Sequence, residues 1–377
     1  MIFISEQFAN ELKNNINSEK YEDIWFELRR KAEKCLKIEP FSVTFSKSPA
    51  ASGNIHDFCS EGPYWWQNPD DPDGPYIRRD GETNPSSFLQ HRLDSSKMSE
   101  TISYLALAGY YLQEKKFTDY AVKLLSVWFL DEETKMNPHL EYGQAIKGMC
   151  DGRGIGIIDT VVFVRVIYSL GFIEHDGGYK TEIEGLKKWF SDYLNWLDTS
   201  KKGIEERDYY NNHANWWNTQ AAAYAVFIGD DEMLEKCFDR FRNKIIPIQT
   251  GADGSFTDEM KRTRSFRYSM YNLEACSILC ELAHSKGVDL WNFKTADNKG
   301  MKNTLDFLLP YYENPFLWKN QQIYGDLPAD DISFQLGGLR LNDKKYSEAS
   351  RTKGKNYYCI RNSSFIGPLA LLPGFFE

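Results

Sequence analysis

Two segments of the sequence bring together side chains that suit proton transfer beside an anion. The first lies at or just inside the start of a predicted helix and consists of Asn211, Asn212 and His213. The second interleaves arginine with tyrosine and includes Arg262, Arg264, Tyr268 and Tyr271. Amide and guanidinium groups can neutralise a carboxylate, while imidazole and phenol can accept or donate a proton. These residue types therefore predict removal of a proton beside a carboxylate group.

Polymers of uronic acids are substrates that need this combination. The C5 proton of a uronate is too weakly acidic for simple abstraction, so a lyase first neutralises the carboxylate. A tyrosine or histidine then acts as the base, and a tyrosine acts as the acid toward the O4 leaving group. Neighbouring cations would help a tyrosine in the second segment to spend time as phenolate. Two structural alternatives stay open: His213 as a helix cap or core group, and the arginines as a solvated basic face.

Residues 52–85 are rich in aromatic and charged side chains. The candidate substrate-binding residues in this segment are Trp65, Trp66, Arg78 and Arg79. Indole rings form flat platforms for sugar rings, and arginine can bind a uronate carboxylate. The structural alternative is an aromatic staple that fixes the segment to a helical core. The acidic residues between positions 70 and 73 do not match the glycine and glutamate positions of a calcium loop, and we predict no metal and no cofactor.

A glycine-rich polar segment, YGQAIKGMCDGRGIGIIDT, covers residues 142–160. Its GRGIG run has neither a preceding buried strand nor a GKS or GKT ending, so it is a poor match to a nucleotide-binding loop. Glycine here more simply allows the chain to turn close to neighbouring backbone. We expect Gln144 and Arg153 to face a substrate cleft.

The composition narrows the class of partner. The 377 residues include 45 Lys and Arg against 54 Asp and Glu, which gives a formal charge of −9 and argues against a nucleic-acid partner. Arginine clusters in an acidic chain call for an anionic partner, which we predict to be an acidic polysaccharide or oligosaccharide. The seven cysteines are odd in number and form no CxxC pair, so neither a zinc knuckle nor a disulfide framework is indicated.

Helical periodicity dominates the elements that must position these side chains. A helix is predicted over residues 21–36, and from about residue 96 helices follow one another with little strand-like alternation. The later predicted helices are 96–115, 117–131, 154–170, 180–197, 212–228, 231–246, 263–284 and 302–310. Alternating helices without a strict repeat predict an all-α fold, an incomplete α/α barrel or toroid, in a single domain of residues 1–377. A long irregular loop at about residues 40–96 would line its cleft.

The predicted helix over residues 263–284 sets the geometry of the second segment. Arg264, Tyr268 and Tyr271 would share one face of it, at spacings of four and three. Arg262 would lie on a different face of the helix unless the helix begins after it.

The N-terminal residues bear on the cellular compartment of the protein. Their apolar run is too short for the core of a secretory signal, and no stretch approaches the roughly 18 apolar residues of a membrane span. We therefore expect no membrane partner and a cytoplasmic location for the chain as given, or a periplasmic or secreted one if a leader was removed. The sequence does not predict an oligomeric state.

Four motifs, taken in order, resemble those of the alginate lyase domain family. They are YWWQNPDDPDGPYIRRDG, YGQAI with GRGIGIID, NNHANWW and RTRSFRYSMYNLEA, and the resemblance spans about residues 40–325. Members of this family are α/α toroid polysaccharide lyases that act on alginate or glucuronan, which implies β-elimination as the reaction. The resemblance also implies that Asn212 and His213 contact the uronate carboxylate, with the base either His213 or the tyrosine. It implies further that Arg262 neutralises the carboxylate and that Tyr268 is the catalytic tyrosine.

Two rival functions stay open at this point. A glycoside hydrolase on the same type of barrel would need two carboxyl groups roughly 5–10 Å apart, and its candidates are Asp57, Asp159 and Glu259. A non-catalytic glycan-binding protein would keep the cleft without turnover.

Overall fold

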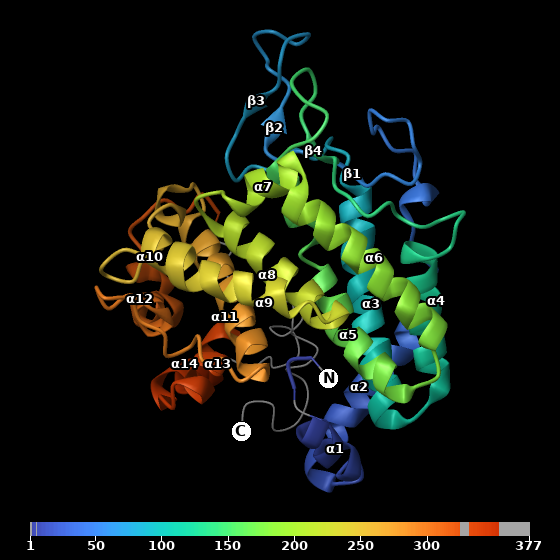
Figure 1. Cartoon of the computed structure of the whole chain (residues 1–377). Coiled ribbons are helices and arrows are strands. Elements are labelled where there is room, and N and C mark those ends of the chain that lie inside the picture. The colour runs from blue at the N-terminus through green and yellow to red at the C-terminus, as the bar shows by residue number, and fades with distance from the viewer. Residues whose placement is uncertain (1, 5, 325–331, 354–377) are drawn as a thin grey trace. The chain divides into compact units, whose positions relative to one another are not determined.

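The computed structural model describes residues 2–4, 6–324 and 332–353, and most of the described chain is helical (Figure 1). The chain divides into two compact units. The first comprises Met1–Asp208 and Phe227–Gly229, and the second comprises Tyr209–Val226 and Asp230–Glu377. The single domain expected from the sequence stays a prediction.

The helices of the first unit pack around α3. They are α1 (Glu6–Asn14), α2 (Glu22–Cys35), α3 (Gln90–Leu112), α4 (Lys115–Phe129), α5 (Phe163–Asp176), α6 (Lys180–Thr199) and α7 (Lys201–Arg207). α3 contacts α2, α4 and α5, and it is buried on nearly every face between Met98 and Tyr111. Gly109 allows α3 to approach α4 closely, because a Cβ there would lie 2.1 Å from Oγ1 of Thr118. An apolar helix surrounded in this way forms the centre of a core.

Two small sheets stiffen the loop that precedes α3. β1 (Cys59–Glu61) pairs in parallel with β4 (Tyr142–Ala145), and β2 (Trp65–Trp66) pairs antiparallel with β3 (Ile77–Arg78). In the second pair Trp65 lies opposite Arg78. The segment is otherwise irregular, as predicted, but it is shorter than expected because α3 begins at Gln90 rather than near residue 96.

The second unit is built on α8 and α11. Its helices are α8 (Asn212–Ile228, with its end in the first unit), α9 (Asp231–Arg240), α10 (Ile246–Gln249), α11 (Ser265–Ser285), α12 (Met301–Glu313), α13 (Ile332–Arg340) and α14 (Lys344–Lys353). α11 contacts α12 and α13, and most of its residues are buried. The helix predicted over residues 231–246 is interrupted, because the π-helix Phe241–Ile245 separates α9 from α10.

One stretch of the first unit is both apolar and helical. Within the described residues no single helix is long and apolar enough to cross a membrane. The pair Gly154–Thr160 and Phe163–His175, bent by 41°, passes only when the two are taken together, on length and composition. The first member is a 3-10 helix, so the predicted helix over 154–170 is in fact two elements.

Candidate active site

The start of α8 is held by a carboxyl group from a distant part of the chain. Oε1 of Glu259 accepts hydrogen bonds from the backbone N–H of Asn212 and from its Nδ2, each at 2.7 Å. The first N–H groups of a helix have no partner within the helix, so an acceptor placed there stabilises its N-terminus. Both residues are buried. The predicted position of the helix start is confirmed, and Glu259 fixes the amide of its first residue.

Asn211 completes the turn that leads into α8. Its Oδ1 accepts a hydrogen bond from the backbone N–H of His213 at 3.1 Å, as a capping side chain does. Its backbone carbonyl accepts a bond from Nε2 of Gln249 at 3.2 Å. Because Asn211 is itself buried, its contacts hold the neighbouring residues in place.

His213 lies beside an aromatic pair, Tyr209 and Tyr210, that is not among the predicted site residues. The ring of Tyr209 meets the His213 ring edge-on at 5.4 Å between centroids, and Tyr210 stacks on Tyr209 at 4.5 Å. Tyr210 is 56% exposed. An exposed ring at this place is the kind of surface that binds the apolar face of a sugar. The available signal was the two tyrosines directly before the NNH motif.

Arg262 and Tyr268 form a stacked pair next to the start of α11. The guanidinium carbon of Arg262 lies 3.8 Å from the centroid of the Tyr268 ring, and the Arg262 side chain is only 15% exposed. This contact is possible because α11 begins at Ser265, after Arg262. Nη1 of Arg262 also lies 4.0 Å from Oε2 of Glu259.

The charge state of Glu259 depends on competing effects. Burial raises the pKa of the Glu259 carboxyl, since a low-dielectric environment disfavours its charged form. The hydrogen bonds from Asn212 and the charges of Arg262 and His213 act in the opposite direction without cancelling the effect of burial. The pKa of Glu259 is therefore raised above its ordinary value.

Arg264 and Tyr271 are placed differently from Tyr268. Arg264 precedes α11, and its guanidinium carbon lies 5.2 Å from the centroid of Tyr324. Tyr271 packs on the buried Trp216, with ring centroids 4.8 Å apart. The helical face expected to carry all three residues therefore does not include Arg264, because the helix starts one residue later.

In the first unit, Trp65, Arg153 and Gln144 form a chain of contacts. The guanidinium carbon of Arg153 lies 5.7 Å from the Trp65 ring centroid. Arg153 donates through Nε to the backbone oxygen of Gln144 at 2.9 Å and through Nη2 to its Oε1 at 3.1 Å. Nε2 of Gln144 donates to the buried Asp159 at 3.3 Å. Gln144 has a φ of 50°, in the left-handed region.

Trp66 and Arg79 form a second aromatic and cationic pair. The guanidinium carbon of Arg79 lies 5.0 Å from the Trp66 ring centroid, and the indole Nε1 donates to the carbonyl of Glu82 at 3.0 Å. Arg78 is 55% exposed at its side chain and pairs with Asp80 at 2.8 Å. Each tryptophan is half-buried, so both the sugar platform and the aromatic staple stay compatible with its position.

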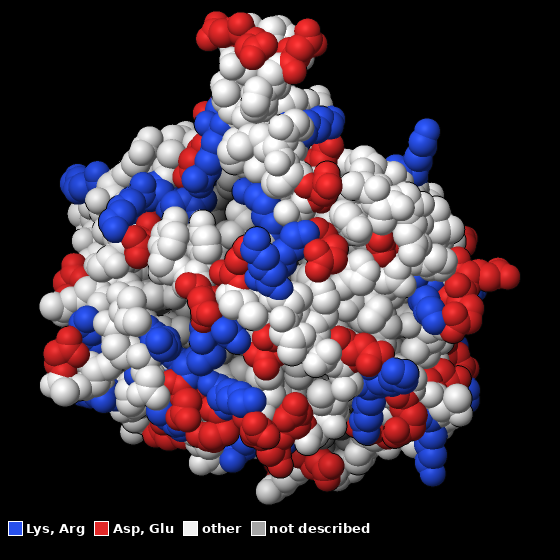
Figure 2. All heavy atoms as spheres, turned by 45° about the horizontal axis from the view of Figure 1, so that its top comes forward, with Lys and Arg blue, Asp and Glu red and all other residues white. Residues whose placement is uncertain are grey.

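The tip of the β2–β3 loop is acidic, unlike the part of the hairpin that carries Arg78 and Arg79. Its exposed acidic residues are Asp70, Asp71 and Asp73. In Figure 2 red side chains cover the projecting end at the top of the view, where this loop lies. The aromatic and basic pairs of this hairpin thus lie near its strands, while its end is acidic.

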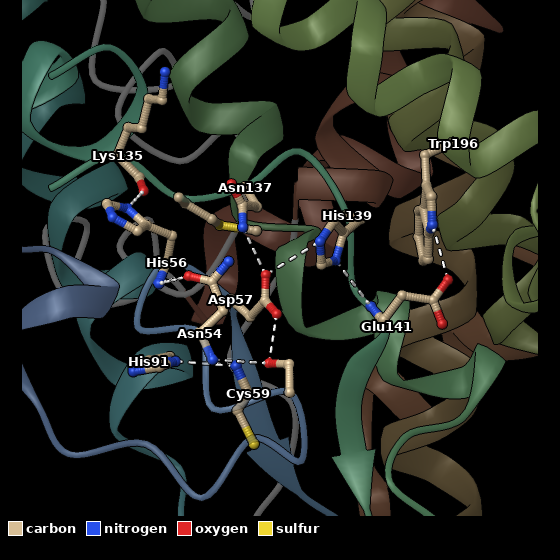
Figure 3. Close-up of polar contacts among 12 residues, drawn as sticks. Asn54, His56, Asp57, Cys59, His91, Lys135, Asn137, His139, Glu141 and Trp196 are labelled. Carbon is tan, nitrogen blue, oxygen red and sulfur yellow. Dashed lines mark hydrogen bonds and ion pairs between the residues drawn. The ribbon is translucent and has the colours of Figure 1, made fainter. Parts of the chain in front are cut away.

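Asp57 anchors a polar network between two loops of the first unit (Figure 3). Its carboxylate accepts from Oγ of Ser52 at 2.6 Å and from Nδ2 of Asn137 at 2.7 Å, and it lies 3.2 Å from Nε2 of His139. The His139 ring in turn lies 6.3 Å from that of Trp196. These contacts tie the loop before β1 to the loop before β4.

The three carboxyl groups considered for a hydrolase are all buried and bonded to protein groups. Asp57 is held in the network just described, Asp159 accepts from Ser60 at 2.5 Å, and Glu259 accepts from Asn212. Such groups are poorly placed to protonate or attack a substrate. In the described part of the chain, no three His, Cys, Asp or Glu side chains are grouped so that they could hold a metal.

The sequence matches the alginate lyase family over residues 42–318. Among solved structures, an alginate lyase from Bacteroides ovatus is 31% identical with a TM-score of 0.89, and the match covers 100% of this chain and 99% of that chain. Alginate lyase A1-III from Sphingomonas species A1 is 16% identical with a TM-score of 0.56, over 89% of this chain and 88% of that chain.

A variant of A1-III complexed with a tetrasaccharide is 15% identical with a TM-score of 0.50, over 84% of this chain and 88% of that chain. The two A1-III structures bear on the fold alone. None of the curated proteins matches significantly. The matches confirm the predicted fold class, an all-α toroid with few strands.

Proposed function

Because the chain belongs to the alginate lyase family, and is therefore a polysaccharide lyase, we propose that it cleaves a 1,4-linked polyuronate by β-elimination. Mannuronate-rich alginate or glucuronan is the proposed substrate. The observation that carries this proposal is the arrangement around Glu259 in the second unit. There one buried carboxyl contacts both Asn212 and Arg262, and Arg262 stacks on Tyr268.

The proposed reaction assigns a role to each of these side chains. Asn212 and Arg262 donate hydrogen bonds through their N–H groups to the uronate carboxylate. These bonds stabilise the negative charge that develops when C5 loses its proton. His213 or Tyr268 removes that proton, and the C5–H electron pair becomes the C4=C5 double bond. The C4–O4 bond breaks, and Tyr268 protonates the departing oxygen. The positive charge of Arg262 on the Tyr268 ring supports a role in which that tyrosine transiently carries negative charge.

We assign substrate binding to side chains outside this reacting group. In the first unit they are Trp65, Trp66, Arg78, Arg79, Gln144 and Arg153, and in the second Asn211, Arg264 and Tyr271. Each unit of a polyuronate has a pyranose ring and a carboxylate. An aromatic ring can stack on the first, and a neighbouring guanidinium group can bind the second. Asn211 contributes by holding the backbone of His213.

An absorbance assay tests the proposal. Elimination leaves a conjugated double bond on the new non-reducing end, so lyase products absorb in the near ultraviolet, whereas hydrolysis gives reducing sugar alone. We expect absorbance to rise with mannuronate-rich alginate or glucuronan, in a panel that also holds guluronate blocks, pectate and glycosaminoglycans. Reducing ends without absorbance would contradict β-elimination, and absorbance confined to pectate or glycosaminoglycans would contradict the proposed substrate.

A further inference from the structure

Glu259 is a buried carboxyl group for which the proposed chemistry has no direct use. It is fully buried, and carboxyl groups are almost never fully buried unless they are paired. Oε1 accepts two hydrogen bonds from Asn212, and Oε2 lies 4.0 Å from Nη1 of Arg262. Because no solvent reaches Glu259, it is badly placed to exchange a proton with a polysaccharide. Any contribution to the reaction has to pass through its two neighbours.

The contact with Asn212 fixes the direction of an amide. An asparagine side chain has a donor end and an acceptor end of nearly the same shape, so its orientation depends on its hydrogen-bond partners. Oε1 of Glu259 accepts from Nδ2, while among the described residues Oδ1 of Asn212 has no hydrogen-bond partner. Glu259 is therefore the group that sets the orientation of this amide. Nδ2 keeps a second hydrogen with which to donate to a substrate carboxylate.

The contact with Arg262 links the amide to the tyrosine. Nη1 of Arg262 lies 4.0 Å from Oε2 of Glu259, and its guanidinium carbon lies 3.8 Å from the ring centroid of Tyr268, so Arg262 has a neighbour on each of two sides. Asn212 opens α8, whereas Arg262 lies just before α11, and no helix joins them. One carboxyl group thus contacts both groups to which carboxylate neutralisation is assigned.

We propose that Glu259 is a positioning residue that orients the Asn212 amide and holds Arg262, so that both donate to the same uronate carboxylate. This inference rests on the proposed function. Glu259 touches no reacting atom in this mechanism. Its effect is to place two donors before the substrate arrives, which is how preorganised groups stabilise developing charge.

Two substitutions at this position separate the two contacts. Glu259→Gln keeps a carbonyl oxygen that can accept from Asn212 but places an amide nitrogen near Arg262, whereas Glu259→Ala removes both contacts. We expect kcat to fall roughly 100-fold in Glu259→Ala, the scale on which one transition-state donor is lost, with KM changed less than about threefold. Glu259→Gln should recover part of that loss because it still orients Asn212.

A matched control is available within the second unit. Glu281 is also a buried carboxyl, and it accepts hydrogen bonds from Trp291 and Arg340. Glu281→Gln should lower the melting temperature while kcat stays near that of the unmodified protein. Comparing the variants shows whether a fall in kcat follows from losing any buried carboxyl group or only from losing that of Glu259.

The experiment measures kcat, KM and melting temperature for all three variants and the unmodified protein on the best substrate of the panel. If Glu259→Ala does not fold, Glu259→Gln alone decides, and we expect its kcat to fall roughly 10-fold. A folded Glu259 variant with unchanged kcat, or one that changes only the melting temperature as Glu281→Gln does, overturns the inference. An unmodified protein that produces no absorbance on any polyuronate overturns the proposed function instead.

Discussion

The guanidinium of Arg262 covers the ring of Tyr268, with 3.8 Å between the guanidinium carbon and the ring centroid. A cation in this position is attracted to the electron-rich face of the aromatic ring. The pair joins residues six positions apart across the start of α11. Removing the hydroxyl oxygen of Tyr268 separates the proton-transfer role of this residue from the packing of its ring.

Tyr268→Phe should abolish turnover while the folded protein still binds oligosaccharide. The substitution deletes the hydroxyl but keeps the ring under Arg262, and loss of a proton-transfer group typically lowers the rate by about 10²–10⁴. Absorbance kinetics and calorimetric binding of a uronate oligomer measure the two effects. Tyr311→Phe, on α12, is the control. A Tyr268→Phe variant with nearly unchanged turnover would remove this tyrosine from the catalytic group.

Salt should act differently on exposed and buried arginines. Arg78 is largely exposed and Arg262 is not, and salt screens exposed charges far more strongly. Arg78→Gln should therefore raise KM at low salt and flatten its salt dependence, whereas Arg262→Gln should lower kcat at all salt concentrations. Steady-state kinetics between low and high ionic strength measure both. Lys188→Gln on α6 should do neither, and tight binding of neutral oligomers without salt dependence would contradict a polyuronate substrate.

Trp65→Ala and Trp66→Ala distinguish a sugar platform from a staple. As a platform, each ring should contribute to substrate capture, so KM on long chains should rise several-fold with little loss of stability. As a staple, its removal should cost about 3–5 kcal/mol of unfolding free energy, with KM unchanged in the folded fraction. Denaturant unfolding and kinetics on the same two proteins decide between these outcomes. We expect the first.

The acidic tip of the β2–β3 loop should slow the capture of a polyanion. Replacing Asp70, Asp71 and Asp73 by asparagine removes three negative charges from exposed positions near Arg78 and Arg79 in the sequence. kcat/KM should then rise at low salt and return to the unmodified value at high salt, because long-range repulsion is screened. An increase that persists at high salt would show that the effect is not electrostatic.

Glu259 should make stability depend on pH in a definite direction. Burial raises the pKa of Glu259 above its ordinary 4.5, so between 4.5 and the raised value the folded protein binds more protons than the unfolded chain. Its contribution to stability is thus lost as pH rises through that window, and Glu259→Gln should lack this loss. Urea unfolding of both proteins across the window measures it. Parallel curves would contradict the raised pKa.

Local pattern predicted the elements of the site better than its connections. The start of α8 was predictable because asparagines favour helix N-termini, and the Arg262 contact with Tyr268 followed once the helix began after the arginine. The link from Glu259 to Asn212 spans 47 positions, and nothing in local sequence encodes such a contact. Sequence alone therefore does not predict Glu259 as a partner of Asn212.

Short helices are also hard to predict from local sequence. α7 and α14 carry few apolar residues, so they show no periodic stripe, and two adjacent glycines weaken the helical pattern of α13. Tyr210 was overlooked for a different reason. Exposure depends on how the chain folds around a ring, and sequence spacing alone does not reveal it.

The backbone of Gln144 has a consequence for attempts to stabilise the protein. At a φ of 50° a side chain with a Cβ is strained by about 1–2 kcal/mol, and glycine adopts this conformation without that cost. Glycine at position 144 would relieve that strain, but it would also remove the amide that joins Arg153 to the buried Asp159. A buried group that loses its hydrogen-bond partner costs about 1–3 kcal/mol, which offsets the gain. Engineering for heat resistance by replacing strained residues with glycine should therefore leave Gln144 unchanged.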